Sequence, residues 1–577
     1  MSFRVEKNVM VPMRDGVTLA TDLWIPDDRP APVLLVRLPY GKDLFPGEFS
    51  YPVMPNIFSL LEAGYAVAWQ DCRGVFGSGG QFQPLLQEPE DGADTVAWLC
   101  EQQWCDGNVG TYGHSYLGVV QWATASQAPP GLRAIAPSIS STDWYAAPWH
   151  SDGGALSWHS LWSFVTLMTM LAPQPKDGAD AADVVGEAAG MFDDLRPHLE
   201  RLPLSDQQLL VTQWDWFAEG LRHPDRDDFW QQVSVYDRIE EIEVPALHIG
   251  GWFDPFVGNM ARSFARMRAQ AGSVAAREQQ RLIIGPWDHL TFGGVYHDRQ
   301  FGLAADVAAV DLTADYIEFF DRHLRGRTAA PQGRAPVRIF VMGVDEWRDE
   351  QDWPLPDTVY IDYYLDSGQA DRASEGGALT TQVPTVDGVA TYTYDPADPV
   401  PTAGGRILLP AALNATGPVD QRAVEARDDV LCFTTAELEE PVEVTGHVSL
   451  VLHVASSARD TDFTGKLVDV FPDGHAVYLT DGILRARYRN SLSEPELLEP
   501  GHTYELTVDM SVTSNVFLPG HRIRLEVSSS NFPRFDRNTN TGGVVAEDTD
   551  SDLVVATNEV FHGPHRPSRL VLPVIRR

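Results

Sequence analysis

The stretch that decides the fold reads Val109-Gly110-Thr111-Tyr112-Gly113-His114-Ser115-Tyr116-Leu117-Gly118. A β-branched and aromatic run enters a glycine, a serine follows two residues later, and an apolar helical pattern begins at once. This order predicts a strand, a sharp turn and a helix, with Ser115 at the apex of the turn. Such a turn lifts the serine hydroxyl above a parallel sheet and points the next backbone N–H into the same space. The spacing is G-x-S-x-x-G and not the commoner G-x-S-x-G, so for this motif alone an ordinary loop that contains a serine is an equal alternative.

Length and charge limit the classes of function. A chain of 577 residues is too long for one hydrophobic core, and two to four domains are expected. The formal net charge of −38 repels nucleic acid and anionic membrane surfaces, so neither is predicted as a partner. The aromatic content of 10% supplies material for large cores and for an aromatic pocket.

The cysteines and the N-terminal sequence indicate a cytoplasmic protein. The four cysteines form no C-x-x-C pair and have no histidine at metal-binding spacing, so neither a metal site nor a disulfide framework is predicted. Free thiols in a reducing compartment are the default expectation. The first residues lack the apolar core of a signal peptide, and the apolar stretch near residues 161–173 is too short to span a bilayer.

Buried strands alternate with helices in the first part of the chain. Residues 10–25 alternate around a Met-Arg-Asp-Gly turn and predict a β-hairpin. Helical patterns at 56–63 and 91–100 separate strands that are apolar throughout, which is typical of a parallel sheet covered on both faces. The predicted strands span residues 33–36, 65–69, 109–112, 132–136, 246–249 and 282–284.

Two changes of pattern divide the chain further. The strand rhythm stops between residues 136 and 244, where helical spacing predicts an all-helical insertion that caps the site. From about Trp353 onward, recurrent turn signals separate short alternating runs, which predicts an antiparallel jelly roll. The expected fold is therefore an α/β hydrolase in two parts, 1–143 and 238–352, with a helical cap at 144–237 and a jelly roll at 353–577.

A serine hydroxyl needs a base, and the base needs an orienting carboxylate. Two buried strands end in glycine turns that carry these groups, Gly250-Gly251-Trp252-Phe253-Asp254 and Gly285-Pro286-Trp287-Asp288-His289. The order Ser, Asp, His is the order in this fold, so we expect Ser115 as nucleophile, Asp254 as orienter and His289 as base. Asp288 is expected to be a solvated or supporting carboxylate. The rival bases follow no buried strand, and they are His114, His150, His159 and His297.

The second donor to an oxyanion is not fixed by spacing. Tyr40 closes the strand segment at residues 33–40, where such a donor is needed, and a tyrosine hydroxyl can supply it. An ordinary loop tyrosine is the alternative at this point.

Together these segments resemble the serine hydrolase family that contains the cocaine esterases, the X-prolyl dipeptidyl aminopeptidases and the α-amino acid ester hydrolases. The resemblance runs the whole length, includes the domain order, and is strongest to the cocaine esterases. It is carried by blocks at residues 39–42, 71–80, 104–110, 113–118, 251–254, 285–289, 530–533 and 538–542.

The resemblance implies roles for individual residues. It assigns Ser115, Asp254 and His289 to the triad, and the Tyr40 hydroxyl and the Tyr116 backbone N–H to the oxyanion hole. It also implies an acyl pocket made of Trp149, Phe164, Phe256, Leu408 and Leu409. Phe164 and Leu409 stand where the resembled esterases carry a larger or aromatic side chain, and the loop at 43–55 differs, which implies a pocket of altered shape.

The pocket residues also bear on the substrate. A free α-ammonium group on a substrate needs carboxylates around it. At the corresponding positions this chain has Pro255-Phe256-Val257 and Trp149, which favour neutral aromatic or hydrophobic acyl groups. We therefore expect a serine carboxylesterase that uses no cofactor and acts on small-molecule esters. The alternatives are an aminopeptidase or amino-acyl hydrolase with the same triad and, less favoured, a non-enzymatic binding protein. Formation of a homodimer is a further alternative, because exposed strand edges of the C-terminal β domain can pair.

Overall fold

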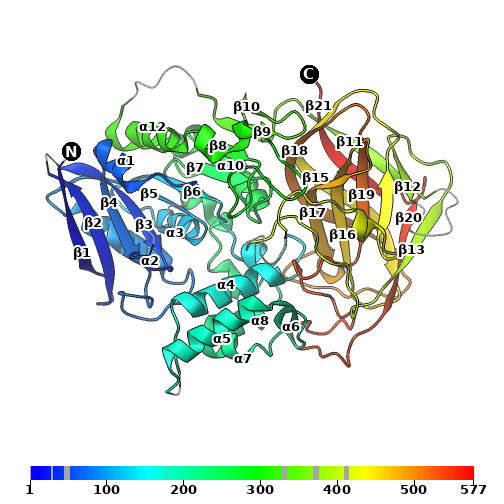
Figure 1. Ribbon diagram of the computed structural model, residues 1–577, viewed down its shortest axis with the longest axis horizontal. Helices are drawn as coiled ribbons and strands as arrows, with labels where there is room; N and C mark the ends of the chain where they lie inside the picture. The colour runs from blue at the N-terminus through cyan, green and yellow to red at the C-terminus, as the bar shows by residue number, and fades with distance from the viewer. Residues whose placement is uncertain are drawn as a thin grey trace.

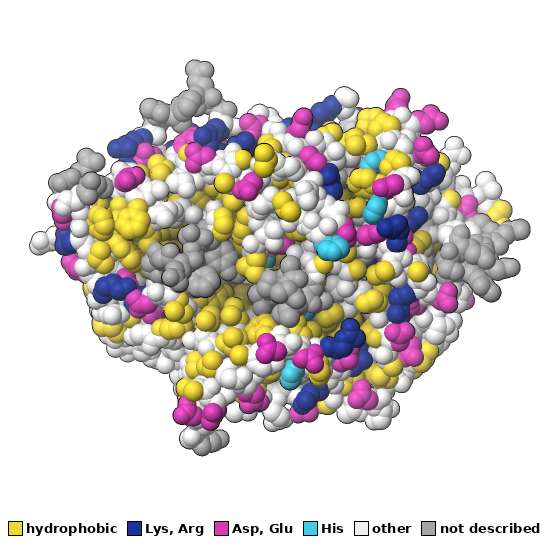
Figure 2. Space-filling model, in the orientation of Figure 1, with side chains coloured by type: hydrophobic (Ala, Val, Ile, Leu, Met, Phe, Trp, Pro, Cys, Tyr) yellow, Lys and Arg dark blue, Asp and Glu magenta, His cyan; other side chains and the backbone are white. Residues whose placement is uncertain are grey.

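The computed structural model describes residues 2–27, 30–44, 52–176, 178–327, 334–367, 376–408 and 415–577. Figure 1 shows a sheet with helices on the left, a second body of strands on the right, and a group of helices below their junction. On the face shown in Figure 2, acidic and basic side chains are interspersed.

The first sheet has the order β1-β2-β4-β3-β5-β6-β7-β8-β9-β10 among the described residues. Neighbours from β4 to β9 run parallel, whereas β1, β2 and β10 pair antiparallel with their neighbours. The strands are β1 Phe3–Pro12, β2 Thr18–Pro26, β3 Ala31–Leu38, β4 Ala66–Asp71, β5 Cys105–His114, β6 Leu132–Ser138, β7 Leu247–Gly251, β8 Arg281–Gly285, β9 Val337–Val341 and β10 Glu346–Glu350.

Each strand predicted from the apolar runs is present, and the predicted hairpin is the antiparallel pair β1 and β2. The central strands read as continuous apolar runs because helices bury both of their faces. Apolar side chains of α1 and α12 pack on one face, and those of α2, α3 and α10 pack on the other. These helices are α1 Ile57–Glu62, α2 Glu88–Cys100, α3 Tyr116–Ala125, α10 Val257–Gln270 and α12 Leu312–Arg325, with a short α11 at Val274–Glu278. The short turns η3 Leu303–Ala305 and η4 Val307–Ala309 precede α12.

The insertion lies between β6 and β7, and its described elements are helical apart from connecting loops. Its long helix α4 is almost wholly buried, which matches the apolar run that opens it. The elements are η1 Tyr145–Trp149, α4 Trp158–Leu171, α5 Ala181–Asp193, α6 Arg196–Leu199, α7 Gln208–Gln213, α8 Asp215–Leu221, α9 Asp228–Gln231 and η2 Tyr236–Glu241.

The C-terminal part is built from strands that pair antiparallel, apart from the parallel contact of β12 with β14. The path of strands runs β13-β20-β15-β21-β11-β12-β14-β19-β16-β17, with β18 paired to β15 and also in contact with β17. The strands are β11 Thr358–Asp366, β12 Gly377–Thr380, β13 Gly388–Tyr394, β14 Leu431–Thr434, β15 Val442–Ser456, β16 Asp462–Val470, β17 Ala476–Arg485, β18 Tyr504–Phe517, β19 Arg522–Ser528, β20 Ala556–His562 and β21 Arg569–Ile575. Short helical segments occur at α13 Arg422–Glu425 and η6 Ala486–Tyr488.

Every helix within the described ranges is too short or too polar to cross a bilayer.

Candidate active site

Ser115 lies at the apex of the turn between β5 and α3. Its backbone has φ 56° and ψ −128°, a conformation that a residue with a side chain rarely adopts and that costs about 1–3 kcal/mol. The Ser115 N–H donates to the Ser138 carbonyl at the end of the neighbouring strand β6 over 3.0 Å. The surrounding sheet therefore holds the serine in a strained position at its carboxyl edge.

The two glycines of the motif allow this turn to form. A Cβ at Gly113 would lie 2.6 Å from the Leu117 Cβ, and a Cβ at Gly118 would lie 2.5 Å from the Ser140 Cβ. Both distances are far below van der Waals contact. The G-x-S-x-x-G spacing thus follows from the close approach of α3 to the ends of β5 and β6.

The structure brings the three predicted triad residues together. His289 Nε2 lies 3.0 Å from Ser115 Oγ, and His289 Nδ1 lies 2.6 Å from Asp254 Oδ2. Asp254 follows β7 and His289 follows β8, so both loops leave the same edge of the sheet as Ser115. Asp254 is 1% exposed and His289 is 5% exposed, whereas Ser115 is partly open to solvent. This geometry allows the imidazole to take a proton from the serine while the carboxylate fixes its tautomer.

Local hydrogen bonds hold the loops of the acid and the base. The Phe256 N–H donates to Asp254 Oδ1 over 2.8 Å, which leaves Oδ2 directed at the imidazole. Asp288 accepts from the Leu290 N–H over 2.8 Å and also accepts from the Thr416 hydroxyl of the C-terminal half.

Of the two alternatives predicted for Asp288, burial excludes a solvated carboxylate, and its hydrogen bonds agree with a supporting one. Asp288 fixes the His289 loop. Burial raises the pKa of the Asp288 carboxyl, and the hydrogen bond from Thr416 opposes that rise.

Two groups occupy positions suited to an oxyanion hole. Tyr116 is the first residue of α3, so its backbone N–H has no partner within the helix. Tyr40 lies two residues beyond β3, which is the parallel neighbour of β5, and its side chain is buried. Tyr40 and Tyr116 thus follow neighbouring strands of the sheet, and their assignment to an oxyanion hole stays a prediction.

The Tyr116 side chain is anchored in a buried ionic network. Its hydroxyl accepts from the Leu85 N–H and donates to Glu88 Oε1, each over 3.2 Å. Glu88 Oε2 in turn pairs with Arg37 Nη1 over 2.7 Å, and both side chains are at most 4% exposed. Burial raises the pKa of the Tyr116 hydroxyl well above its usual value, and the charge of Glu88 adds to the rise. The hydroxyl therefore stays protonated and fixes the first turn of α3.

Aromatic side chains surround the triad. The Phe256 ring lies 5.4 Å from the His289 ring, and the Phe164 ring stacks on that of Tyr116 at 6.3 Å. Trp149 contacts Trp230 at 4.9 Å, and Trp149 and Phe164 both contact Trp216. Four of the five predicted pocket residues, together with Tyr40 and Tyr116, belong to one apolar cluster: Trp149, Phe164, Phe256 and Leu408. Leu409 lies outside the described residues.

The rival histidines do not occupy the position of the base. Burial lowers the pKa of His114 well below its usual value, and the neighbouring His289 lowers it further. Burial also lowers the pKa of His150 to about 3 and that of His159 to about 4. His297 is exposed and pairs with Asp298. The position between Ser115 Oγ and Asp254 Oδ2 is filled by His289.

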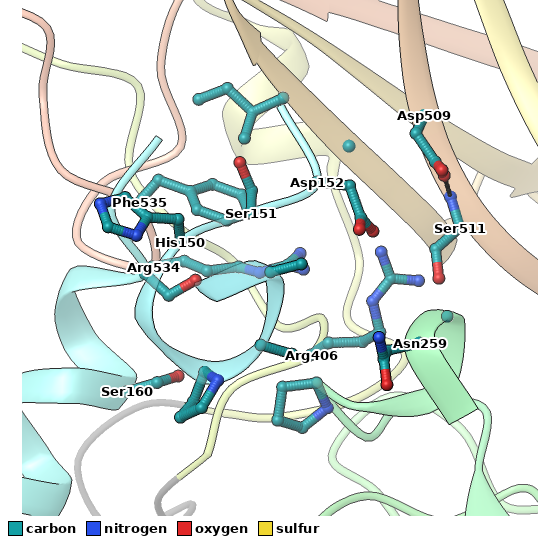
Figure 3. Close-up of a pocket in the computed structure, with 18 of the residues that line it drawn as sticks. His150, Ser151, Asp152, Ser160, Asn259, Arg406, Asp509, Ser511, Arg534 and Phe535 are labelled. Atoms are coloured by element: carbon teal, nitrogen blue, oxygen red, sulfur yellow. Dashed lines mark hydrogen bonds between the residues drawn. The ribbon is translucent and has the colours of Figure 1, made fainter. Parts of the chain in front are cut away.

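A polar cavity of about 50 Å³ lies behind the acid loop, and Pro255 forms part of its wall. Its volume exceeds the roughly 10–15 Å³ that one water needs, but it is too small for an aromatic acyl group. Figure 3 shows that side chains from all three parts of the chain converge there, including Asp152 of the insertion, Asn259 of α10, and Arg406, Asp509 and Arg534 of the C-terminal half.

Within the described ranges, no group of three or more histidine, cysteine or acidic residues is placed to hold a metal ion.

Sequence patterns did not reveal the residues that support the site. Glu88, Arg37 and Thr416 carry no motif, because each acts through a contact distant in sequence. The aromatic residues Trp144 and Trp216 could have been suspected from the tryptophan-rich insertion, and both contact Phe164.

Comparisons with known proteins identify the family. Residues 15–291 match the model of the X-Pro dipeptidyl-peptidase (S15 family), and residues 330–571 match that of the X-Pro dipeptidyl-peptidase C-terminal non-catalytic domain. The chain is 49% identical over 583 residues to a cocaine esterase of Rhodococcus sp. (strain MB1 Bresler). This match covers 100% of this chain and 99% of that protein. An α-amino acid ester hydrolase of known structure is 26% identical, with a TM-score of 0.84 over 99% of this chain and 96% of that chain.

More distant relatives agree with these matches. An aminopeptidase from a marine sediment thaumarchaeote is 24% identical and has the same fold, with a TM-score of 0.82 over 100% of this chain and 97% of that chain. The match to the Xaa-Pro dipeptidyl-peptidase of Lactobacillus helveticus is 30% identical but covers only 17% of this chain and 14% of that protein. The fold is therefore an α/β hydrolase followed by a β-rich domain, and the chain belongs to the X-Pro dipeptidyl-peptidase (S15) family of serine hydrolases.

Proposed function

We propose that this protein hydrolyses carboxylic esters with aromatic or hydrophobic acyl groups through an acyl-enzyme on Ser115. The observation that carries the proposal is the continuous hydrogen-bonded series from Ser115 Oγ through His289 to Asp254. The full-length similarity to a cocaine esterase supports the ester as the bond that is cleaved.

The reaction begins when His289 Nε2 takes the proton of the Ser115 hydroxyl and the oxygen attacks the ester carbonyl carbon. The carbonyl oxygen becomes negative and accepts hydrogen bonds from the Tyr116 N–H and the Tyr40 hydroxyl. His289 then donates its proton to the leaving alcohol, and the acyl group stays on Ser115. A water activated by His289 releases the acid and restores the serine.

The aromatic surroundings support the choice of acyl group. Phe256 lies against His289, and Phe164 lies against the ring of Tyr116, so an acyl group bound beside the triad meets ring faces and edges. Aromatic groups gain from such contacts beyond the area they bury, by about 0.5–1.5 kcal/mol for each pair. Leu408 of the C-terminal half belongs to the same apolar cluster and extends this surface.

A peptidase or amino-acyl hydrolase with the same triad is the alternative, favoured by the family match. Such an enzyme must hold a free α-ammonium group near the scissile bond. The positions directly after Asp254 are Pro255, Phe256 and Val257, none of which can pair with a cation.

Steady-state hydrolysis of phenyl benzoate, phenyl acetate and an Ala-Pro anilide separates the two functions. We expect turnover of the benzoate, slower turnover of the acetate and none of the anilide, with all activity lost in Ser115→Ala. Preferential cleavage of the anilide would establish the alternative. Failure of Ser115 to react with a fluorophosphonate probe in folded protein would favour a binding protein instead.

The finer divisions of the chain belong to the same proposal. We place boundaries after residues 143, 237 and 352 and describe 353–577 as a jelly roll. The alternation of turns and strands in that segment and the helices α4–α9 between β6 and β7 support these limits.

We also propose a cytoplasmic location, a small-molecule ester as the partner, and pairing of exposed strand edges if the protein forms a homodimer.

A further inference from the structure

A second cavity, of about 370 Å³, lies between the insertion and the loop that precedes α2. This volume falls within the range of roughly 300–1,000 Å³ that is usual for small-molecule sites. Ser115, Tyr40, Asp254 and His289 are not among its lining residues. The triad therefore does not line this cavity, which among the described residues shares only Trp149 with those predicted for the acyl pocket.

Aromatic side chains form a large part of the wall. The aromatic residues come from three separate segments of the chain, and they include Phe82, Trp144, Trp149, Trp214, Phe229 and Trp230. Their rings contact one another, with centroids 5.9 Å apart for Phe82 and Trp214 and 4.9 Å apart for Trp149 and Trp230. Because these rings fix each other's positions, the cavity is formed in advance of any ligand.

The polar part of the wall favours an uncharged ligand. Five glutamines contribute neutral amides, and they are Gln81, Gln83, Gln174, Gln213 and Gln232. The charged groups at the cavity already have partners, since Lys176 pairs with Asp215 over 2.7 Å and Glu219 pairs with Arg222 over 2.6 Å. An anionic ligand would therefore lose its hydration without gaining an unpaired positive charge.

We propose that this cavity is a second binding site for an uncharged aromatic molecule that carries a hydroxyl or carbonyl oxygen. The ring would stack on the indoles, and the oxygen would exchange hydrogen bonds with the glutamine amides. Trp149 lines this cavity and is also predicted to line the acyl pocket, and Trp144 contacts Phe164 of that pocket at 6.2 Å. The ligand class therefore overlaps with the alcohols and esters proposed for the catalytic site.

Isothermal titration calorimetry with 2-naphthol tests the site. Ser115 is first blocked with phenylmethylsulfonyl fluoride, so that the sulfonyl group and its ring fill the catalytic pocket and only the second cavity is open. We expect saturable binding of one 2-naphthol per blocked protein. The anionic analogue 2-naphthoate is expected to bind at least tenfold more weakly, because the only lysine among the described residues that line the cavity is already paired.

Two variants locate the binding. Trp214→Ala removes part of the wall and is expected to weaken 2-naphthol at least tenfold. Phe229→Ala is expected to do the same, and it removes a ring that is only partly buried, so it answers the question if Trp214→Ala does not fold. Trp98→Ala, on α2 and outside the cavity, is the matched control and should bind normally.

Either of two results would overturn the proposal. The first is that the blocked protein binds no 2-naphthol, and the second is that Phe229→Ala and Trp98→Ala bind it equally well. Because binding is measured with Ser115 blocked, neither result bears on the proposed esterase activity.

Discussion

The two sheet-containing halves of the molecule contribute to the site in different ways. In the first half, parallel strands β5, β7 and β8 end at one edge of the sheet, and the loops beyond them carry Ser115, Asp254 and His289. In the second half, antiparallel strands send neighbouring ends to opposite edges. This half contributes support, such as the Thr416 hydroxyl on Asp288, and the apolar side chain of Leu408. Parallel strands thus gather reactive groups, and the antiparallel body holds their loops in place.

The junction between the halves is itself ionic. Arg262 of α10 lies between Asp152 of the insertion and Asp509 of β18, and its Nη1 is 3.2 Å from Asp509 Oδ2. Because α10 begins three residues after Asp254, this junction anchors the helix that follows the acid loop. If the comparison is right, changes in the first half should affect the chemical step most, and changes in the second half should affect stability and alignment.

The largest effect is expected at the acid of the triad. Asp254→Asn should keep the fold but lower kcat by roughly 10⁴-fold, because an amide stabilises the wrong tautomer of His289. Stopped assays with phenyl benzoate measure the loss, and Asp288→Asn serves as the control with a much smaller effect. Near-normal turnover of Asp254→Asn would mean that another acid orients the base.

The second largest loss of kcat is expected at the proposed oxyanion hole. Tyr40→Phe removes the hydroxyl that we assign to the oxyanion, and kcat should fall by roughly 10²–10³-fold with KM little changed. Steady-state kinetics separate the two constants. A rise in KM at constant kcat would place Tyr40 in substrate binding instead.

The anchor of Tyr116 should have a smaller effect on the same step. Tyr116→Phe removes the hydrogen bonds to Leu85 and Glu88, and we expect kcat to fall about 3- to 10-fold, equivalent to the roughly 1 kcal/mol of one neutral hydrogen bond. Tyr112→Phe is the matched control, since the Tyr112 hydroxyl is also buried and accepts a hydrogen bond from Trp69 but lies on β5. Equal losses in both variants would indicate a general effect on stability.

Removing a supporting contact from the C-terminal half should lower stability measurably and kcat only modestly. Thr416→Val leaves the buried Asp288 carboxylate without one donor, at a cost of about 1–3 kcal/mol in stability. Thermal unfolding followed by circular dichroism measures the loss, and kcat should fall less than in Tyr40→Phe. A larger loss of kcat than in Tyr40→Phe would contradict the division of roles between the halves.

The smallest effect concerns pH. Burial tends to lower the pKa of His447, but its hydrogen bond and charge interaction with Asp509 outweigh this and raise the pKa overall, with Asp152 also raising it and Arg262 lowering it. A raised pKa in the folded state means that the pair stabilises the protein fully below the unfolded pKa of about 6.5, and that this is lost as the pH rises through the folded value.

His447→Gln should therefore lower the Tm below pH 6.5 and have a progressively smaller effect at alkaline pH. The partly exposed pair is expected to contribute about 0.5–1 kcal/mol at most. Melting curves of both proteins at several pH values test this. A difference in Tm that grows with pH would reverse the assigned sign.

The sequence alone predicted the first sheet, the helical segment between β6 and β7, and the three residues Ser115, Asp254 and His289 that the structure brings together. It could do so because each triad residue follows a continuous apolar strand and a glycine turn, and because parallel strands bring their carboxyl ends together whatever the rest of the chain does. The sharp turn at Ser115 was also predicted, whereas the close approaches at Gly113 and Gly118 that it requires are seen in the structure.

Only the tertiary structure decided how these residues are held and what surrounds them. Tyr116 meets Glu88, and Asp288 meets Thr416, across 28 and 128 residues of sequence, and no periodic pattern encodes contacts between such distant side chains. The second aromatic cavity likewise depends on three segments that fold against one another. Local sequence specifies strands, turns and caps because their forces act between near neighbours, whereas pockets and buried ionic networks depend on the packing of the whole chain.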